Sequence, residues 1–262
     1  MSVYQVQDFA FSYPFSTRQI KLSGNFVIEA GECILLQGAS GAGKSTLLAA
    51  LKGLIPHLIA GNLIGEINFH NRAITDLNEQ DLLKIGYLQQ NPDSQLICPY
   101  VYSELAFGLE NQGYSAELIQ AKISLIANKF ALTQLLTRKV SSLSGGEKQK
   151  INLLAILLLE PEVLLLDEPT AFLDPQSACQ IMQIIGEYIQ DKTVIIIEHN
   201  LHYLQKLVTR GLYIDEDGKI IPQALAMISV QNPKIPTQQI NLLDYLYVFE
   251  VQPFFSNPMT SS

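Results

Sequence analysis

A chain of 262 residues that is 48% hydrophobic can bury one large domain or two small ones. Its formal net charge is -8 with 17 Lys plus Arg, and no basic stripe is visible, so we expect no nucleic-acid partner. The longest nearly uninterrupted apolar run, Ile151 to Leu159, is closed by Glu160 and Pro161 and falls short of the ~20 residues that a membrane span needs.

The first residues, MSVYQVQDF, lack the basic-then-apolar order of a signal peptide. Three cysteines, Cys33, Cys98 and Cys179, are not clustered, which predicts neither a disulfide framework nor a zinc site. Both observations favour a cytoplasmic protein.

Four short aliphatic runs without polar alternation are typical of strands buried on both faces of a parallel sheet. They are residues 33–37, 85–88, 163–167 and 194–198. Between them, residues 45–52, 147–159 and 175–190 have the pattern of helices, so the sequence predicts an α/β fold.

Residues 92–159 show helical patterning and no convincing strand, which predicts a helical insertion between the second and third buried strands. After Gly218 the sequence becomes rich in Pro and Gln. It then offers one short apolar helix candidate, residues 240–249, before an end that we expect to fray.

A glycine-rich segment, GASGAGKST, follows the first predicted strand and precedes a helix. It matches the phosphate-binding pattern G-x-x-x-x-G-K-[ST], in which backbone N–H groups and a helix N-terminus hold an anion. Lys44 is predicted to contact the β- and γ-phosphates, and the Ser45 hydroxyl to ligate Mg²⁺. A plain strand-to-helix turn is the alternative, but it needs neither the lysine nor the hydroxyl. The predicted loop comprises Gly38, Ala39, Ser40, Gly41, Ala42, Gly43, Lys44, Ser45 and Thr46.

Two carboxylates end the third predicted strand, VLLLDE. Asp167 would lie where the sheet opens, in a position to hold Mg²⁺ directly or through water. Glu168 beside it could polarise an attacking water as a general base. On its own, the pair could also simply end the strand before Pro169.

A second candidate anion site lies in LSGGEKQK, residues 143–150. Ser144 and Glu147 form an S-x-x-E capping box for the helix that follows, and capping alone could explain the segment. However, Gly145 and Gly146 also expose backbone N–H groups at this helix start. One chain cannot easily direct this site and the loop at residues 38–46 to the same γ-phosphate.

These motifs resemble those of the ATP-binding-cassette (ABC) ATPases, and the resemblance covers about residues 3–220. It includes FLDP at residues 172–175 and an isolated histidine after the last predicted strand. The resemblance implies a P-loop NTPase fold with a mostly parallel central sheet, an antiparallel β edge and an inserted α-helical subdomain. It implies a nucleotide-binding domain at residues 1–222, with the helical subdomain at about 92–160, and a short extension at 223–262.

The resemblance also implies a head-to-tail dimer of two ABC ATPases. In it, the signature of one subunit closes over ATP held by the P-loop of the other. The signature residues here are Leu143, Ser144, Gly145, Gly146 and Glu147.

Single residues take implied roles from the same resemblance. Tyr13 matches the aromatic residue that stacks on adenine, although a lone aromatic near a strand is often a core residue. Gln90 matches the glutamine that contacts Mg²⁺ or water, with Gln89 as the adjacent alternative. His199 matches the switch histidine at the γ-phosphate, and Asp174 matches the D-loop aspartate that links the two sites. The implied catalytic set is Glu168, His199 and Gln90, and the implied Mg²⁺ ligands are Ser45, Gln90 and Asp167.

A narrower resemblance lies in QNPDSQLICPYVYSELAFGLEN, residues 90–111, which is similar to the energy-coupling factor (ECF) importer ATPases. These work as homo- or heterodimers at the cytoplasmic face of the cell membrane. They bind a T-component and a substrate-binding S-component for vitamins or for cobalt or nickel ions. Glu147 and Lys150 depart from the glutamine and arginine that are usual at these signature positions.

The favoured mechanism is that two subunits enclose two Mg·ATP, Glu168 helps water attack the γ-phosphate, and dimer motion drives a membrane partner. Another ABC transporter branch is one alternative, although the tail is too short for the regulatory domain of sugar importers. A soluble ABC ATPase of assembly or repair is a second, disfavoured by the absence of a long heptad segment and of a second cassette. A nucleotide-binding subunit with one degenerate site is a third.

Overall fold

The structure is a computed structural model and describes residues 1–16, 19–189, 192–204 and 207–223. The predicted helix at residues 240–249, and nearly all of the predicted extension at 223–262, lie outside the described residues. In the part that is described, none of the helices is both long and apolar enough to cross a membrane.

A six-stranded sheet contains the four predicted buried strands. Its order is β11-β10-β4-β9-β8-β7, parallel except for the antiparallel pair of β10 and β11. The strands are β4 (Cys33–Gly38), β7 (Ile85–Leu88), β8 (Val163–Asp167), β9 (Thr193–Ile197), β10 (Arg210–Ile214) and β11 (Ile220–Gln223). The predicted parallel sheet is confirmed, except that Glu198 lies just after β9 rather than within it.

Alternate residues of these strands enter two different hydrophobic cores, which is why the strands lack polar alternation. In β8, Leu164 and Leu166 face one core, while Val163 and Leu165 face the other. All four side chains are fully buried. Successive side chains of a strand point to opposite faces, so a strand covered on both sides is apolar throughout.

A second, antiparallel sheet forms the edge that the family resemblance implied. It contains β1 (Ser2–Ser12), β2 (Gln19–Lys21), β3 (Phe26–Glu29), β5 (Asn62–Phe69) and β6 (Arg72–Ala73). The pairing of β1 with β5 shifts register between Gln7 and Ala10, where Asp8 has φ +45°. This bulge interrupts the alternation of β1, so its sequence pattern does not mark it as one strand.

Seven α-helices are seen in the described residues: α1 (Lys44–Leu51), α2 (Leu54–His57), α3 (Glu79–Leu83), α4 (Val101–Asn111), α5 (Ala116–Lys129), α6 (Gly145–Leu158) and α7 (Pro175–Tyr188). Short 3-10 helices lie at η1 (Ile74–Asp76), η2 (Pro92–Ser94), η3 (Thr133–Leu135), η4 (Val140–Ser142) and η6 (Leu201–Tyr203). Between β7 and β8, a stretch that is described throughout, there is no named strand, so the predicted helical insertion is confirmed.

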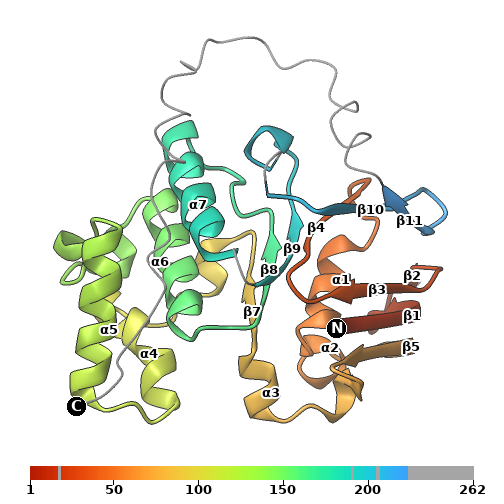
Figure 1. Ribbon diagram of the computed structural model, residues 1–262, viewed down its shortest axis with the longest axis horizontal. Coiled ribbons are helices and arrows are strands. Elements are labelled where there is room, and N and C mark those ends of the chain that lie inside the picture. Colours follow the sequence, from red (N-terminus) through yellow and green to blue (C-terminus); the bar gives the residue numbers. More distant parts are fainter. Residues whose placement is uncertain (17–18, 190–191, 205–206, 224–262) are drawn as a thin grey trace. The chain divides into compact units, whose positions relative to one another are not determined.

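The helices divide between the two faces of the six-stranded sheet. Buried residues of α4, α5, α6 and α7 share one core with one face, whereas α1 and the antiparallel sheet share the other core with the opposite face. Figure 1 shows α4, α5 and α6 packed together on the side of the sheet away from α1. Helices α1 and α6, which begin at the two glycine-rich motifs, therefore lie on different faces.

Candidate functional site

The predicted chemistry gathers at the carboxyl ends of four adjacent parallel strands. The glycine-rich loop follows β4, His199 follows β9, Glu168 follows β8 and Gln90 follows β7. Because the strand order is β4-β9-β8-β7, these segments leave the sheet side by side. Open α/β sheets bind ligands at this edge.

Two glycines shape the loop between β4 and α1. Gly38 has φ +149°, and a Cβ there would lie 2.7 Å from the carbonyl oxygen of Ile214. Gly43 has φ +98°, and a Cβ there would lie 2.3 Å from Cγ2 of Ile20. Only glycine fits either position without strain, so the loop can turn its backbone inward ahead of the α1 N-terminus.

Lys44 places a cation inside this loop. Its side chain is 7% exposed, and Nζ donates hydrogen bonds to the carbonyl oxygens of Gly38 at 2.9 Å and Ala39 at 3.0 Å. Burial lowers the pKa of Lys44, while the carboxylates of Glu168 and Asp167 oppose that shift. The ammonium therefore lies within the loop and experiences the negative charge of both carboxylates, and there it can bind a phosphate.

The remaining loop residues surround this cation. Ala39, Ser40 and Gly41 are exposed and form the rim, Ala42 is half-buried, and Thr46 is buried. Tyr13 lies against the loop, because its hydroxyl and Oγ1 of Thr46 are 3.0 Å apart. The tyrosine ring contacts Phe11 edge-on at 4.9 Å and is 38% exposed, so part of its surface is open to a ligand.

Ser45, Asp167 and Tyr87 form an oxygen cluster beside Lys44. Ser45 donates to Oδ1 of Asp167 at 3.1 Å, and the hydroxyl of Tyr87 donates to Oδ2 at 3.4 Å. Burial raises the pKa of Asp167, with a further contribution from the negative charge of Glu168. A hydroxyl beside a carboxylate suits Mg²⁺, which prefers oxygen ligands.

This cluster alone would not enclose a metal ion. Among the described residues, no group of three or more His, Cys, Asp or Glu side chains could hold one. A Mg²⁺ ion here would therefore take its other ligands from phosphate oxygens and water, as it does in many nucleotide sites. The residues present fit the predicted ion on that condition.

Glu168 is held by the side chains of two other predicted site residues. Gln90 donates from Nε2 to Oε2 of Glu168 at 2.7 Å, and Nε2 of His199 lies 3.2 Å from Oε1. Glu168 has φ +47°, a conformation that is uncommon for non-glycine residues and often occurs at functional sites. Gln89 faces elsewhere: its side-chain oxygen accepts from Ser94.

The signature segment starts α6, and its predicted capping box is confirmed. Ser144 accepts from the backbone N–H of Glu147 at 3.3 Å, and the carboxylate of Glu147 accepts from the N–H of Ser144 at 2.8 Å. Leu143 is buried beneath the turn. Gly145 is exposed, whereas a Cβ on Gly146 would lie 2.4 Å from Oγ of Ser177.

The start of α6 is also joined to the segment that carries the glutamines. Lys148 donates to Oδ1 of Asp93 at 2.6 Å. Gln149, 2% exposed, donates from Nε2 to the carbonyl oxygens of Gln89 and Pro169, each at 3.3 Å. A movement of α6 would therefore pull on the segments that position Gln90 and Glu168.

Asp174 caps α7 in the exposed loop after β8. Its Oδ1 accepts from the backbone N–H groups of Gln176 and Ser177 at 3.0 Å, and Oδ2 accepts from the Ser177 hydroxyl at 2.6 Å. These hydrogen bonds, led by the Ser177 hydroxyl, lower the pKa of Asp174. The predicted D-loop aspartate is thus an N-cap that fixes the start of α7.

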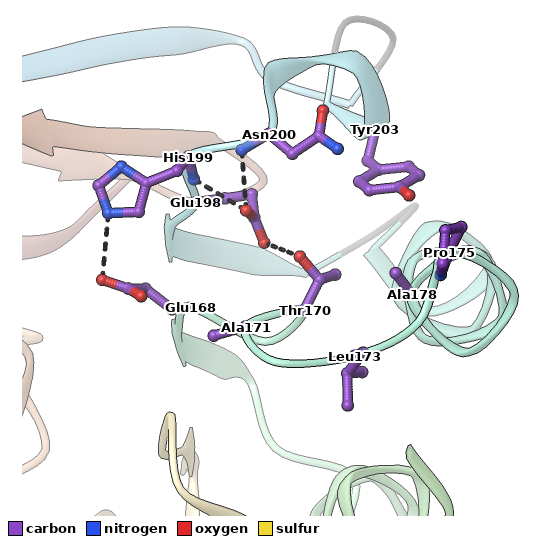
Figure 2. Close-up of a pocket in the computed structure, with 10 residues that line it drawn as sticks. All are labelled: Glu168, Thr170, Ala171, Leu173, Pro175, Ala178, Glu198, His199, Asn200 and Tyr203. Atoms are coloured by element: carbon purple, nitrogen blue, oxygen red, sulfur yellow. Dashed lines mark hydrogen bonds and ion pairs between the residues drawn. The ribbon is translucent and has the colours of Figure 1, made fainter. Parts of the chain in front are cut away.

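A cavity of about 290 Å³ lies beside Glu168 and His199. Figure 2 shows both residues at its edge, with Glu198 and Thr170 between the loops that carry them. Sequence reasoning assigned no role to Glu198, Thr170 or Tyr87. For Tyr87 and Glu198, a polar residue within or just after an apolar strand was the available signal, since buried polar side chains need partners; Thr170 carried no such signal.

Known proteins resemble this chain in sequence and in fold. The sequence pattern of the family described as "ABC transporter" matches residues 23–171. The chain is 35% identical over 218 residues to "Putative HMP/thiamine import ATP-binding protein YkoD" of Bacillus subtilis (strain 168), covering 82% of this chain and 40% of YkoD. It spans less than half the length of the first seven curated relatives that match it.

Two solved structures have a similar fold. One is cbiO1 from Clostridium perfringens, described as part of the ABC transporter complex cbiONQ, with a TM-score of 0.72, 26% identity and coverage of 88% of this chain and 91% of that one. The other is the ATP-binding cassette MJ0796, described as a dimeric post-hydrolysis state bound to ADP and Pi. Its TM-score is 0.70 at 25% identity, with 85% of this chain and 98% of that one covered.

Proposed function

The chain belongs to the ABC transporter ATP-binding family, and we propose that it is the ATP-hydrolysing subunit of a membrane importer. The observation that carries the proposal is the position of Glu168. Its carboxylate is held by Gln90 and His199 at the strand edge that also carries Lys44 and the Ser45–Asp167 pair. A base, a phosphate-binding cation and a candidate metal site thus meet at one edge.

Each group has a part in phosphoryl transfer to water. Lys44 and the backbone N–H groups of the glycine-rich loop bind the phosphate charge, and Tyr13 stacks on the adenine. Ser45, Asp167 and Gln90 would hold Mg²⁺, which when bound neutralises charge on the phosphate oxygens. Glu168 accepts the proton of the attacking water, Gln90 orients the Glu168 carboxylate, and His199 contacts the γ-phosphate. A positioned base of this kind contributes ~10²–10⁴-fold to a rate.

The functional unit in this proposal is a head-to-tail dimer. The support is that α1 and α6 pack on opposite faces of the sheet, so the two glycine-rich helix starts do not share one face. Pairing two cassettes would let Ser144, Gly145 and Gly146 of one close over a nucleotide held by the other. MJ0796, a similar cassette, is described as dimeric.

The membrane partner in the proposal is of energy-coupling factor type. Three observations support it: the segment at residues 90–111, the likeness to YkoD, named for HMP/thiamine import, and the likeness to cbiO1, part of cbiONQ. We propose a peripheral position at the cytoplasmic face, with residues 1–222 as the nucleotide-binding domain, residues 92–160 as its helical subdomain and residues 223–262 as an extension. A T-component and an S-component for a vitamin or for cobalt or nickel ions complete the importer.

Co-purification tests the partner directly. The tagged protein is expressed in its native cell, membranes are solubilised gently, and the proteins that co-purify are identified by mass spectrometry. A polytopic T-type protein together with a small membrane binder is the expected result, with a Lys44→Ala variant retaining both. Recovery of soluble assembly or ribosomal factors alone would overturn the importer and leave the ATPase chemistry to be assigned to another process.

A further inference from the structure

Glu198 is a buried carboxylate that the proposed hydrolysis does not use. It follows β9 directly and is 6% exposed. Burying a charge is costly unless hydrogen bonds compensate for the lost water. Within the described residues, Glu198 forms no salt bridge with a lysine, arginine or histidine, so its compensation comes from hydrogen bonds alone.

Both oxygens of Glu198 accept hydrogen bonds, and the donors lie on two different loops. Oε1 accepts from the backbone N–H groups of His199 at 2.8 Å and Asn200 at 2.9 Å, in the loop after β9. Oε2 accepts from the hydroxyl of Thr170 at 2.5 Å, in the loop after β8. Figure 2 shows Glu198 bridging the two loops.

The two bridged loops carry Glu168 and His199. Strands β8 and β9 are paired in register, with Asp167 opposite Ile197, so the loops start at the same level. The imidazole of His199 is 67% exposed, and its side chain has little packing to hold it. Its 3.2 Å contact with Glu168 therefore depends on where the backbone of residue 199 lies.

We propose that Glu198 is a positioning residue: it fixes the backbone of His199 relative to Glu168 by tying the β9 loop to Thr170. The inference rests on the proposed ATPase function, which it extends to a residue outside the proposed catalytic set. Charge-assisted hydrogen bonds are stronger than neutral ones, so a carboxylate holds three donors more firmly than a neutral side chain would. Glu198 also lines the cavity of about 290 Å³, and its removal would take away the side-chain hydrogen bonds that join the two loops there.

Three substitutions separate positioning from simple folding. Glu198→Ala removes all three hydrogen bonds. Glu198→Gln keeps an acceptor for the two backbone N–H groups and an amide that can donate to Thr170, so it should rescue most of the loss. Thr170→Val removes only the link between the loops. Glu162→Ala is the matched control, because it deletes a carboxylate just before β8, where the partner is His70 rather than a site residue.

The readouts are kcat and KM for ATP, the dissociation constant of a fluorescent ATP analogue, and the NMR signal of the His199 ring. The ring signal is observed in protein carrying ¹³C-labelled histidine and assigned with His199→Ala. A misplacement of about 1 Å can cost ~10²-fold in rate, so we expect Glu198→Ala to lower kcat about 10- to 100-fold. Nucleotide affinity should stay within about two-fold, since the loop at residues 38–46 is untouched. The ring signal should shift in Glu198→Ala and return in Glu198→Gln.

Other results would overturn the inference. They are a wild-type kcat in Glu198→Ala, an unmoved His199 signal, a kcat loss matched by an equal loss of affinity, or the same kcat loss in Glu162→Ala. If Glu198→Ala does not fold, Thr170→Val decides: it should reduce kcat and move the His199 signal. If the wild type hydrolyses no ATP, the proposed function fails, but the ring signal still tests whether Glu198 positions His199.

Discussion

Gly145 and Gly146 are neighbours in the first turn of α6, yet their surroundings differ. A Cβ on Gly145 would meet no described atom within 4 Å. A Cβ on Gly146 would lie 2.4 Å from Oγ and 2.7 Å from Cβ of Ser177 in α7. The Ser177 side chain is held in place, because its hydroxyl donates a hydrogen bond to Asp174. One glycine is thus required by packing within the chain, whereas the other is available to a ligand or partner.

Alanine at each position should separate these two roles. Gly146→Ala should lower the free energy of unfolding by ~1–3 kcal/mol, the usual cost of overpacking. Gly145→Ala should leave stability unchanged or slightly raised, because alanine favours helix, yet it should impair ATP hydrolysis by crowding the exposed helix start. Urea unfolding and phosphate release measure the two effects. Equal stability of the two variants would contradict the packing argument.

Single site residues differ in how far the sequence could predict them. Lys44, Ser45 and Asp167 lie in sequence motifs that indicate their chemistry directly, and the structure brings Ser45 and Asp167 together although they are 122 residues apart. The choice between Gln90 and Gln89 depends on side-chain direction in a loop, which no sequence period fixes. Glu198 could not be predicted in this way, because no motif gives it or Thr170 a role, and the contact between them, 28 residues apart, is placed by strand pairing.

Helix α6 depends on charge at its first turn. The backbone N–H of Ser144 is the main cause that lowers the pKa of Glu147, and Arg138 at 3.2 Å adds to the shift. A carboxyl whose pKa is lowered on folding stabilises the protein above its unfolded pKa, ~4.3 for glutamate. That contribution disappears as the pH falls through the folded pKa.

Glu147→Gln should therefore destabilise the protein at pH 7 by ~0.5–1 kcal/mol, the scale of a helix cap. The difference from wild type should start to shrink as the pH drops below about 4.3, where the unfolded glutamate takes up a proton, and it should vanish as the pH falls through the lower folded pKa. Urea unfolding between pH 7 and pH 3.5 measures this difference in stability. Glu66→Gln is the control for the loss of one charge, because Glu66 is an exposed residue of β5. A difference that stays constant with pH would contradict the electrostatic origin.

At the scale of elements, the sequence predicts the buried strands well and the antiparallel edge poorly. Strands β4, β7, β8 and β9 are covered on both faces, so their apolar runs stand out. Strand β1 mixes buried and exposed residues around its bulge, and β2, with three residues, is too short to show a period. For these strands, family resemblance supplied what periodicity did not.

The separation of α1 and α6 on opposite faces has a consequence for the whole molecule. If the active dimer consists of two copies arranged head to tail, each composite site takes Lys44 from one copy and Ser144 from the other. Lys44→Ala and Ser144→Arg should each be inactive alone. In an equal mixture, about half of the dimers contain one copy of each variant. Such a mixed dimer has one intact composite site and one that carries both substitutions, so about a quarter of wild-type activity should return.

Phosphate release by the mixed variants measures this recovery after subunit exchange. A mixture of Lys44→Ala with Lys44→Met is the control, since no pairing of these two restores a site. The absence of recovery in the first mixture would contradict a head-to-tail dimer made of two copies of this chain.

Measuring ATP hydrolysis by Glu168→Gln tests most directly whether Glu168 is the general base. The substitution replaces one carboxylate oxygen of the proposed base with an amide nitrogen. We would measure phosphate release from saturating Mg·ATP together with particle mass by light scattering, alongside the wild type. We expect a fall of at least ~100-fold in turnover, with ATP still bound and an ATP-dependent dimer retained. Phosphate release at the wild-type rate would contradict the assignment of Glu168 as the base.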